Sequence, residues 1–177
     1  ACFIKGVIDG ETVSGRVSRA KARFMEADLV EVLQSSPHRV EAPCPYFLKC
    51  GGCSYQHIDY PHQLKIKEQQ LREALRRIGG IQDPQVRSII PSPEPLHYRN
   101  RITIHVKEGV LGFFAEKSRE VVEIDQCLLA SEAVNEALQQ LRSQRPLDGN
   151  YLLGEKKSYG GFRQVNDEVA KILSASS

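Results

Sequence analysis

The first 43 residues show the alternation of apolar and polar positions that is typical of β-strands. Aliphatic and β-branched residues gather in three stretches around turn signals such as Asp9-Gly10: FIKGVI, ETVSGRV and ADLVEVL. Four basic residues cluster between two of these predicted strands: Arg16, Arg19, Lys21 and Arg23. The pattern fits a small barrel whose basic hairpin binds oligonucleotides, or a solvated hairpin whose charges serve solubility.

A helical period begins at Pro61, which suits the first turn of a helix. Apolar residues then recur at spacings that form one stripe: Leu64, Leu71, Leu75 and Ile78. Gly79-Gly80 end this segment, so the pattern predicts a helix over residues 61–78. Basic residues lie off the stripe and form either a binding face or a solvated one. If the stripe stays exposed, we expect self-association through it.

The second half of the chain mixes both periods after a proline-rich connector over residues 81–97. Three strand-like runs predict an antiparallel meander: residues 98–106, 110–115 and 120–124. A helix with Ser131 as its N-cap follows, and its apolar face is formed by Val134, Leu138 and Leu141. The mixture predicts an α+β fold.

A last helical segment, DEVAKIL, lies close to the end of the chain. Val165 and Asn166 precede it and are expected to shape the turn into this helix.

Composition and charge exclude several classes of protein. The chain has 177 residues, of which 41% are hydrophobic and 26% charged, as in an ordinary globular protein. Its net charge of +2 does not by itself argue for nucleic acid. No apolar run approaches the ~18 residues that a membrane span needs, and the N-terminus lacks the features of a signal peptide. We therefore expect a cytoplasmic protein with no membrane contact.

The stretch CPYFLKCGGC concentrates three of the five cysteines, and a fourth stands far from it. An odd number of cysteines without a secretory signal argues against a disulfide framework. Four thiolates suit zinc or an iron–sulfur cluster. Three ligands in one loop and one remote ligand favour a [4Fe–4S] cluster held by Cys44, Cys50, Cys53 and Cys127. A zinc site and four inert thiols are the alternatives, and Cys2 is expected to be a core residue.

These residues resemble a family. The stretch from CPYFLKCGGC through the helix ending in RRIGG is similar to the cluster loop and following helix of the iron–sulfur RNA (uracil-5-)-methyltransferases. VIDGETVSGRV and FMEADLVEVLQSSPHRVEAPC resemble part of a TRAM domain, an OB-like RNA-binding barrel. HYRNRITIHV and LGFFAEKSREVVEIDQCLL resemble the family's central domain. GGFRQVNDEVAKIL resembles the entrance to its catalytic domain.

The resemblance implies three regions: a partial TRAM barrel over 1–43, an iron–sulfur central domain over 44–165, and the start of a methyltransferase domain over 166–177. It also implies that Phe162 and Gln164 lie against the flipped uracil or the methyl donor, S-adenosylmethionine. Arg99 and Arg101 alternate along a predicted strand and would hold phosphates near the target in ribosomal or transfer RNA.

The chain lacks the catalytic features of the family. No strand leads into a glycine-rich donor-binding loop, and Cys2 does not match the family's nucleophile. We therefore assign no catalytic residue and expect this chain alone to be inactive. The alternative is a stand-alone RNA-binding or redox-sensing module that holds an iron–sulfur cluster or zinc.

Overall fold

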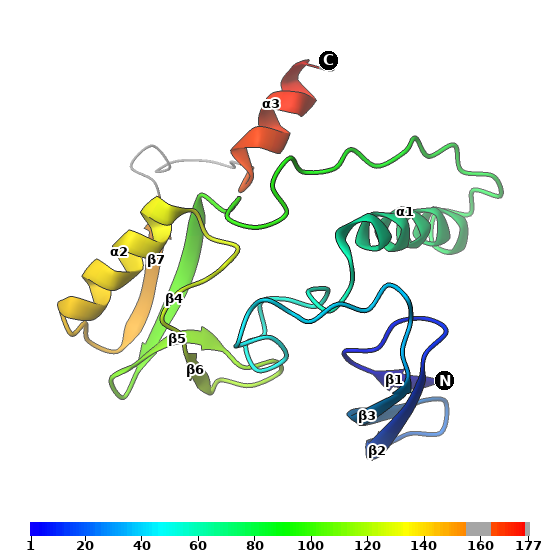
Figure 1. Cartoon of the computed structure of the whole chain (residues 1–177), viewed down its shortest axis with the longest axis horizontal. Coiled ribbons are helices and arrows are strands. Elements are labelled where there is room, and N and C mark those ends of the chain that lie inside the picture. Colours follow the sequence, from blue (N-terminus) through cyan, green and yellow to red (C-terminus); the bar gives the residue numbers. More distant parts are fainter. Residues whose placement is uncertain (155–163, 176–177) are drawn as a thin grey trace. The chain divides into compact units, whose positions relative to one another are not determined.

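The chain folds into two compact units, each with one sheet and one or more helices. The computed structural model describes residues 1–154 and 164–175 (Figure 1). The first unit comprises residues 1–47 and 53–90, and the second comprises residues 48–52 and 91–177. The α+β fold class is confirmed. The three regions expected from the resemblance stay predictions. The two units divide the chain differently, because residues 48–52 of the cysteine loop belong to the second unit and the residues on either side belong to the first.

The sheet of the first unit has three strands, β1 (Cys2–Ile4), β2 (Thr12–Ala20) and β3 (Met25–Gln34). They lie in the order β1-β3-β2, with β1 parallel and β2 antiparallel to β3. All three predicted strands are therefore present. The first is shorter than FIKGVI suggests, because Gly6 adopts a φ of 78° that a strand does not accommodate.

Two expectations for this unit are wrong. Arg16 and Arg19 lie within β2, so only Lys21 and Arg23 belong to the turn that joins β2 to β3. Cys2 is exposed rather than part of the core, because it lies in a three-residue strand with little packed over it. The OB-like barrel stays a prediction, since the structure records an open three-stranded sheet over these residues.

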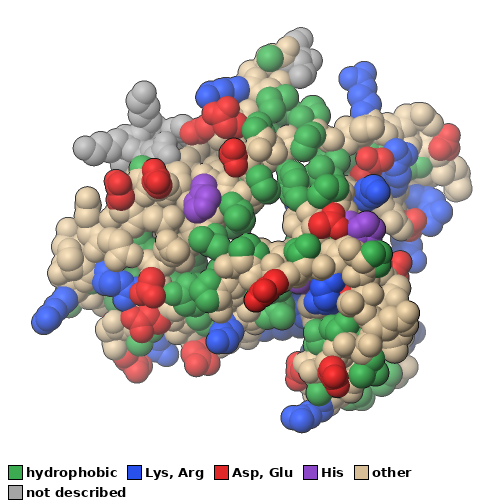
Figure 2. Space-filling model, in the orientation of Figure 1, with side chains coloured by type: hydrophobic (Ala, Val, Ile, Leu, Met, Phe, Trp, Pro, Cys, Tyr) green, Lys and Arg blue, Asp and Glu red, His purple; other side chains and the backbone are tan. Residues whose placement is uncertain are grey.

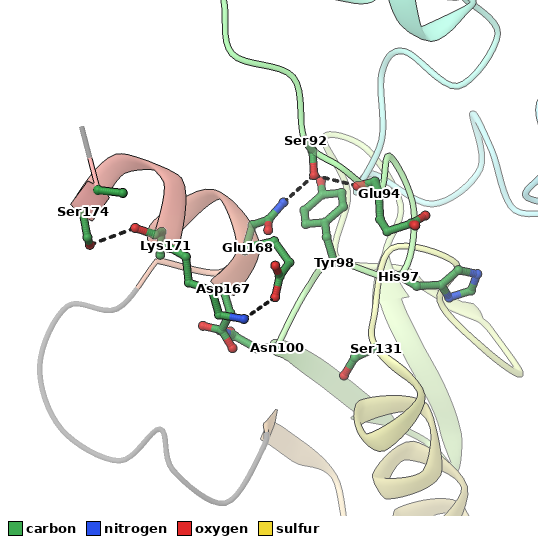
Figure 3. Close-up of a pocket in the computed structure, with 13 residues that line it drawn as sticks. Ser92, Glu94, His97, Tyr98, Asn100, Ser131, Asp167, Glu168, Lys171 and Ser174 are labelled. Carbon is green, nitrogen blue, oxygen red and sulfur yellow. Dashed lines mark hydrogen bonds and ion pairs between the residues drawn. The ribbon is translucent and has the colours of Figure 1, made fainter.

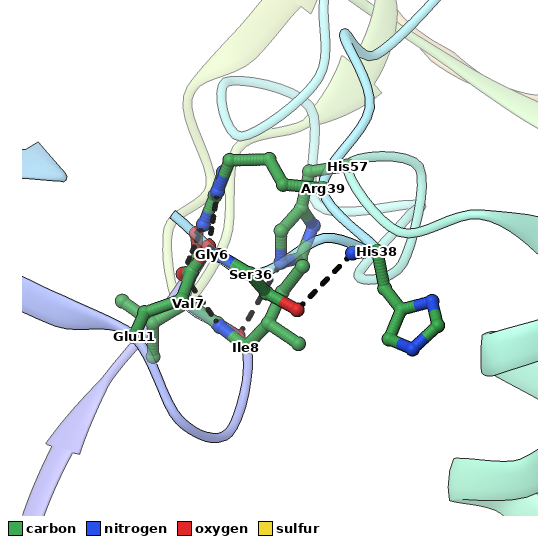
Figure 4. Close-up of polar contacts among 8 residues, drawn as sticks. All are labelled: Gly6, Val7, Ile8, Glu11, Ser36, His38, Arg39 and His57. Atoms are coloured by element: carbon green, nitrogen blue, oxygen red, sulfur yellow. Dashed lines mark hydrogen bonds and ion pairs between the residues drawn. The ribbon is translucent and has the colours of Figure 1, made fainter. Parts of the chain in front are cut away.

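A buried ion pair, Glu11 with Arg39, ties the ends of the β2–β3 hairpin to the loop before β2 (Figure 4). The Glu11 side chain is completely buried, and Arg39 donates from Nε to one carboxylate oxygen and from Nη2 to the other, both at 2.5 Å. The backbone N–H groups of Ile8 and Ser36 donate to the same carboxylate at 2.9 and 3.0 Å. Arg39 also donates to Gly6 O at 2.8 Å. The carboxylate is thus fully surrounded by donors, which is the condition for a buried charge to be tolerated.

Helix α1 (Tyr60–Arg77) belongs to the same unit and begins where the sequence predicts. Asp59 caps it by accepting from the His62 backbone N–H at 2.8 Å, and this bond lowers the pKa of Asp59. None of its residues is buried, and Leu71 and Ile78 of the predicted apolar stripe are 50% and 88% exposed. Self-association through this stripe stays a prediction.

The second unit contains a four-stranded antiparallel sheet in the order β6-β5-β4-β7. Its strands are β4 (Arg101–Lys107), β5 (Val110–Phe114), β6 (Val121–Glu123) and β7 (Gly149–Gly154). The predicted meander is confirmed, and β7 joins it beside β4.

Helix α2 (Glu132–Ser143) supplies the core of this unit (Figure 1). Its buried residues are the three predicted from the sequence: Val134, Leu138 and Leu141. Ser131 is its N-cap residue as predicted, although its side chain makes no capping hydrogen bond. Alternate residues of β4 complete the core, with Ile104 fully buried.

Helix α3 (Asp167–Ala175) closes the described part of the chain. Asn166 shapes its start as expected, because Asn166 Oδ1 accepts from the Val169 backbone N–H at 3.1 Å. Basic and acidic side chains are interspersed on the visible faces in Figure 2, in keeping with the small net charge. Within the described residues, every helix is too short or too polar to span a bilayer.

The Glu11–Arg39 pair predicts a specific acid sensitivity. The Arg39 hydrogen bonds lower the pKa of Glu11 to about 2, from an ordinary value of 4.5. A depressed carboxyl pKa gives stability that is complete above pH 4.5 and is lost as the pH falls toward 2. We expect Glu11→Gln to flatten this decline in urea denaturation followed by circular dichroism, and Glu11→Ala to cost about 3 kcal/mol at neutral pH.

Glu31→Gln is the matched control, because Glu31 is exposed on β3 of the same unit. An equal flattening of the acid decline in Glu31→Gln would contradict the assignment to Glu11.

Candidate functional site

Asn100 joins the start of β4 to the segment that leads into α3 (Figure 3). The residue is 2% exposed. Its backbone N–H donates to Val165 O at 3.0 Å, and its side-chain amide donates to Gln164 O at 3.1 Å and to Asp167 Oδ1 at 2.9 Å. The side chain of Asn100 thereby holds Gln164 and Asp167, and its backbone holds Val165 between them.

Asn166 completes this junction from the other side. Besides capping α3, it donates from Nδ2 to Ser92 Oγ at 2.8 Å, and it is 8% exposed. Ser92 in turn donates to Glu94 O at 2.7 Å. The connector before β4 and the N-terminus of α3 are therefore held together by a partly buried polar network. Asn100 Oδ1 is buried beside it without a hydrogen-bond partner among the described residues.

A cavity of about 910 Å³ opens beside this junction. It is lined by five residues of the segment before β4, by Ser131, and by Asn166 and residues of α3 (Figure 3); the five are Ser92, Glu94, His97, Tyr98 and Asn100. Its charged residues are Glu94, Asp167, Glu168 and Lys171. Lys171 Nζ lies 2.6 Å from Glu168 Oε1, and this contact raises the pKa of Lys171. The volume is in the range of a site for a small molecule or a nucleotide.

The two predicted phosphate ligands have different surroundings. Arg101 is the first residue of β4 and is half-buried. Arg99 lies outside the strand, in isolated bridges with Ala130 and Asn166. The expectation that both occupy one strand is therefore wrong. Arg99 Nε is buried and has no hydrogen-bond partner within the described part of the chain.

Of the two residues expected near the target base, the structure describes one. Phe162 lies outside the described residues. Gln164 is half-buried, and its Oε1 accepts from the backbone N–H of Val165 at 3.1 Å. Its role in binding a base stays a prediction.

In the first unit, Gln56 brings Cys44 and Cys53 together. Gln56 Oε1 accepts from the Cys44 backbone N–H at 3.2 Å, and Gln56 Nε2 donates to Cys53 Sγ at 3.2 Å. His57 follows, 5% exposed, with its ring 5.4 Å from that of Phe47. Burial lowers the pKa of His57, so the ring is neutral at physiological pH.

In the second unit, Cys50 is anchored beside the end of β5. It forms a bridge with Ala115, and the Gly51 backbone N–H donates to Phe114 O at 3.0 Å. A Cβ on Gly51 would lie 3.1 Å from Phe114 O and 3.3 Å from backbone atoms of Glu116, so the loop approaches the strand as closely as glycine allows. The Gly52 backbone N–H donates to Cys50 Sγ at 3.4 Å.

Cys127 is held by Asn135 of α2. Asn135 Oδ1 accepts from the Cys127 backbone N–H at 2.9 Å, and Asn135 Nδ2 donates to Cys127 O at 3.1 Å. This clamp fixes the backbone of the remote cysteine. The sequence alone does not reveal this clamp, because Asn135 is eight residues from Cys127 and has the pattern of an ordinary polar position on a helix.

The structure does not assemble a metal site by itself. All five cysteines lie in the described part of the chain, and none forms a disulfide. No group of three or more histidine, cysteine, aspartate or glutamate side chains is arranged to hold a metal ion among the described residues. The four-cysteine ligand set stays a prediction.

Comparison with known proteins finds several RNA methyltransferases that are similar to this chain. No protein-family model matches it. It is 34% identical over 174 residues to an uncharacterized RNA methyltransferase of Gloeobacter violaceus, covering 96% of the chain and 38% of that protein. It is 34% identical over 170 residues to the 23S rRNA (uracil(1939)-C(5))-methyltransferase RlmD of Pseudomonas putida, covering 92% of the chain and 37% of that protein.

A solved structure agrees with these sequence matches. The tRNA (uracil-54, C5)-methyltransferase of Pyrococcus abyssi, in complex with S-adenosyl-L-homocysteine, superposes with a TM-score of 0.57 at 30% identity. The match covers 80% of this chain and 31% of that one. Over most of its length this α+β chain is thus similar to part of these RNA methyltransferases. Its relatives with an assigned target are uracil-C5 enzymes, and the chain spans a little over a third of the length of the curated relatives it matches.

The junction predicts a local loss of stability in one variant. Asn166→Ala removes the cap of α3 and the hydrogen bond from Asn166 to Ser92, so we expect a loss of about 2 kcal/mol. Hydrogen exchange of residues 167–175 measures it. Ser174→Ala, an exposed change in the same helix, should alter exchange little. Similar protection of α3 in both variants would contradict the role given to Asn166.

Proposed function

We propose that this chain forms the RNA-recognition and iron–sulfur portion of an S-adenosylmethionine-dependent RNA (uracil-5-)-methyltransferase. The whole protein would methylate C5 of a flipped uridine in ribosomal or transfer RNA. The observation that carries the proposal is the 34% identity to the Pseudomonas putida uracil-C5 enzyme over 92% of this chain. The structural match to the Pyrococcus abyssi enzyme supports it independently.

The chemistry sets what such a protein must supply. Uracil C5 is a poor nucleophile until a thiolate adds to C6, after which C5 takes the methyl group and a base removes its proton. S-adenosylmethionine supplies the methyl group when bound. We assign neither the thiolate nor the base to this chain. Cys2 is the one cysteine that is not proposed as a metal ligand, and it lies on an edge strand of the first unit's sheet.

The residues of this chain have binding roles in the proposal. Arg101, half-buried at the start of β4, and Arg99 beside it would hold phosphates near the target nucleotide. Gln164 and Phe162 would contact the flipped base. The buried Asn100 supports this role for Gln164, since its bond to Gln164 O fixes the backbone that carries the amide. A base-contacting side chain needs such a rigid backbone to select one base edge.

The donor chemistry of the cysteines fits an iron–sulfur cluster. Cys44, Cys50, Cys53 and Cys127 would hold it through four thiolates. N–H groups already point at two of these sulfurs, from Gln56 Nε2 to Cys53 and from Gly52 to Cys50. Such bonds stabilise a thiolate over a thiol. When bound, the cluster would cross-link its ligands rather than transfer electrons, because methyl transfer by this route needs none. Reduced thiols also support a cytoplasmic location.

Metal content tests the cluster directly. We expect the chain purified without oxygen to be brown and to contain about four irons and four sulfides per molecule. Cys53→Ser and Cys127→Ser should lose most of the iron, whereas Cys2→Ser should retain it. A colourless protein with a single zinc would instead favour the alternative, a zinc-containing RNA-binding module.

RNA binding and methyl transfer test the function. We expect the 177-residue chain to bind single-stranded RNA with an affinity that falls with salt, because cationic side chains displace counterions. Arg101→Ala should weaken this binding and lower the slope of log K against log salt by about one. No methyl group should pass from labelled S-adenosylmethionine to uridine. Methylation by this chain, or failure to bind any RNA, would each contradict the proposal.

A further inference from the structure

One face of the second unit's sheet is packed and the other is open. Ile102, Ile104 and Val106 of β4 are buried on the side that faces α2. Thr103, between two of them, and Lys107, after the last, are exposed, and Leu152 on β7 is 50% exposed. Alternate residues of a strand point to opposite faces, so Arg101, Thr103, His105 and Lys107 share the open face.

Two aromatic rings lie stacked on this open face. The centroids of His105 on β4 and Phe114 on β5 are 3.7 Å apart, and the ring planes differ by 16°. Both residues are only partly buried. The two rings face each other, so each has one outer face that is not covered by the other ring. A parallel aromatic pair of this type is a platform on which a further planar group can stack.

Two contacts hold the aromatic pair in place, and a glycine keeps the space beside it free of a side chain. His105 Nδ1 lies 2.6 Å from Asn150 Oδ1 of β7, which fixes the tilt of the imidazole ring. Phe114 O accepts from the Gly51 backbone N–H, so the cysteine loop fixes the strand end that carries Phe114. Gly112 pairs with His105, and a Cβ there would lie 1.8 Å from Val122 O. No side chain at position 112 can therefore compete for the space beside the imidazole.

The charges around the platform favour an anionic chain. Arg101 and Lys107 stand at the two ends of β4 on the same face. Lys107 lies 4.0 Å from Glu108, a long and exposed contact that is worth little. Glu123 on β6 is paired with Arg142 at 2.8 Å, which offsets its charge. Aromatic rings between separated cations are the arrangement with which proteins bind single-stranded nucleic acid.

We propose that the His105–Phe114 pair is a stacking subsite for an unpaired nucleotide of the RNA, with Asn150 as a polar neighbour that contacts the base edge. The proposal rests on the RNA-binding function given above and adds a specific site to it. Unpaired nucleotides fit because the bases of a duplex are already stacked and cannot cover an external ring. The subsite would distinguish single-stranded from double-stranded RNA independently of sequence.

Fluorescence anisotropy with a labelled oligouridine, and with a duplex of equal length, tests this subsite on the full 177-residue chain. His105→Ala and Phe114→Leu should each weaken binding of the single strand about ten-fold. The slope of log K against log salt should not change, since no phosphate contact is lost. Gln140→Ala, an exposed change on α2, is the control and should bind as the unchanged chain does.

A second variant separates stacking from folding. The chain contains no tryptophan, so Phe114→Trp places a single tryptophan, which can be excited selectively, at the platform while keeping an aromatic ring. Its affinity should match that of the unchanged chain, and its emission should be quenched as oligouridine binds. Absence of quenching at saturating RNA would overturn the subsite.

The outcomes also separate this inference from the proposed function. If the unchanged chain binds oligouridine but His105→Ala and Phe114→Leu bind equally well, the subsite is wrong and the RNA-binding function stands. If the unchanged chain binds no RNA, both are wrong. An equal loss of affinity in Gln140→Ala would likewise overturn the subsite, because it would show that the effect does not depend on the aromatic pair.

Discussion

The amide of Asn100 is the constraint on which the second unit's candidate site depends. It is buried at the point where the chain enters β4, and it binds the backbone and side chains of a segment more than sixty positions away in sequence. Buried amides of this kind are costly unless they are paired, so the two segments must meet for the unit to fold. This contact positions Gln164, whose carbonyl oxygen accepts from Asn100, and the two arginines on either side of Asn100, Arg99 and Arg101.

The glycines of the cysteine loop place it against the second unit's sheet. Its glycines serve two purposes, because Gly51 lets the loop lie against β5 and Gly52 directs an N–H to the Cys50 sulfur. The same contact holds the strand end that carries Phe114. Any ligand that orders the loop would therefore also order the aromatic pair on the open face of the sheet. In the proposals made above, a structural cluster would thereby affect RNA binding without any redox step.

The first unit relies on a different kind of constraint. Its sheet has few buried residues, and a completely buried carboxylate joined to Arg39 holds the hairpin to the preceding loop. A pair of this kind is a weak source of net stability but is strongly destabilising when one partner is removed. It specifies the arrangement of the loop, whereas burial of apolar surface specifies the second unit.

The sequence by itself determined the helices and strands, because the hydrophobic periods and the capping and turn residues that define them are local. The stripe of α2, the start of α1 at Asp59 and Pro61, and the turn at Asn166 follow from residues within a few positions of one another. Tertiary structure alone decided that Arg99 lies outside the strand, that Cys2 is exposed, and that Asn135 clamps Cys127. It also brought His105 onto Phe114 and Glu11 onto Arg39. These contacts join residues that are at least eight positions apart. They are set by the register of strands and the packing of helices, which no local pattern encodes.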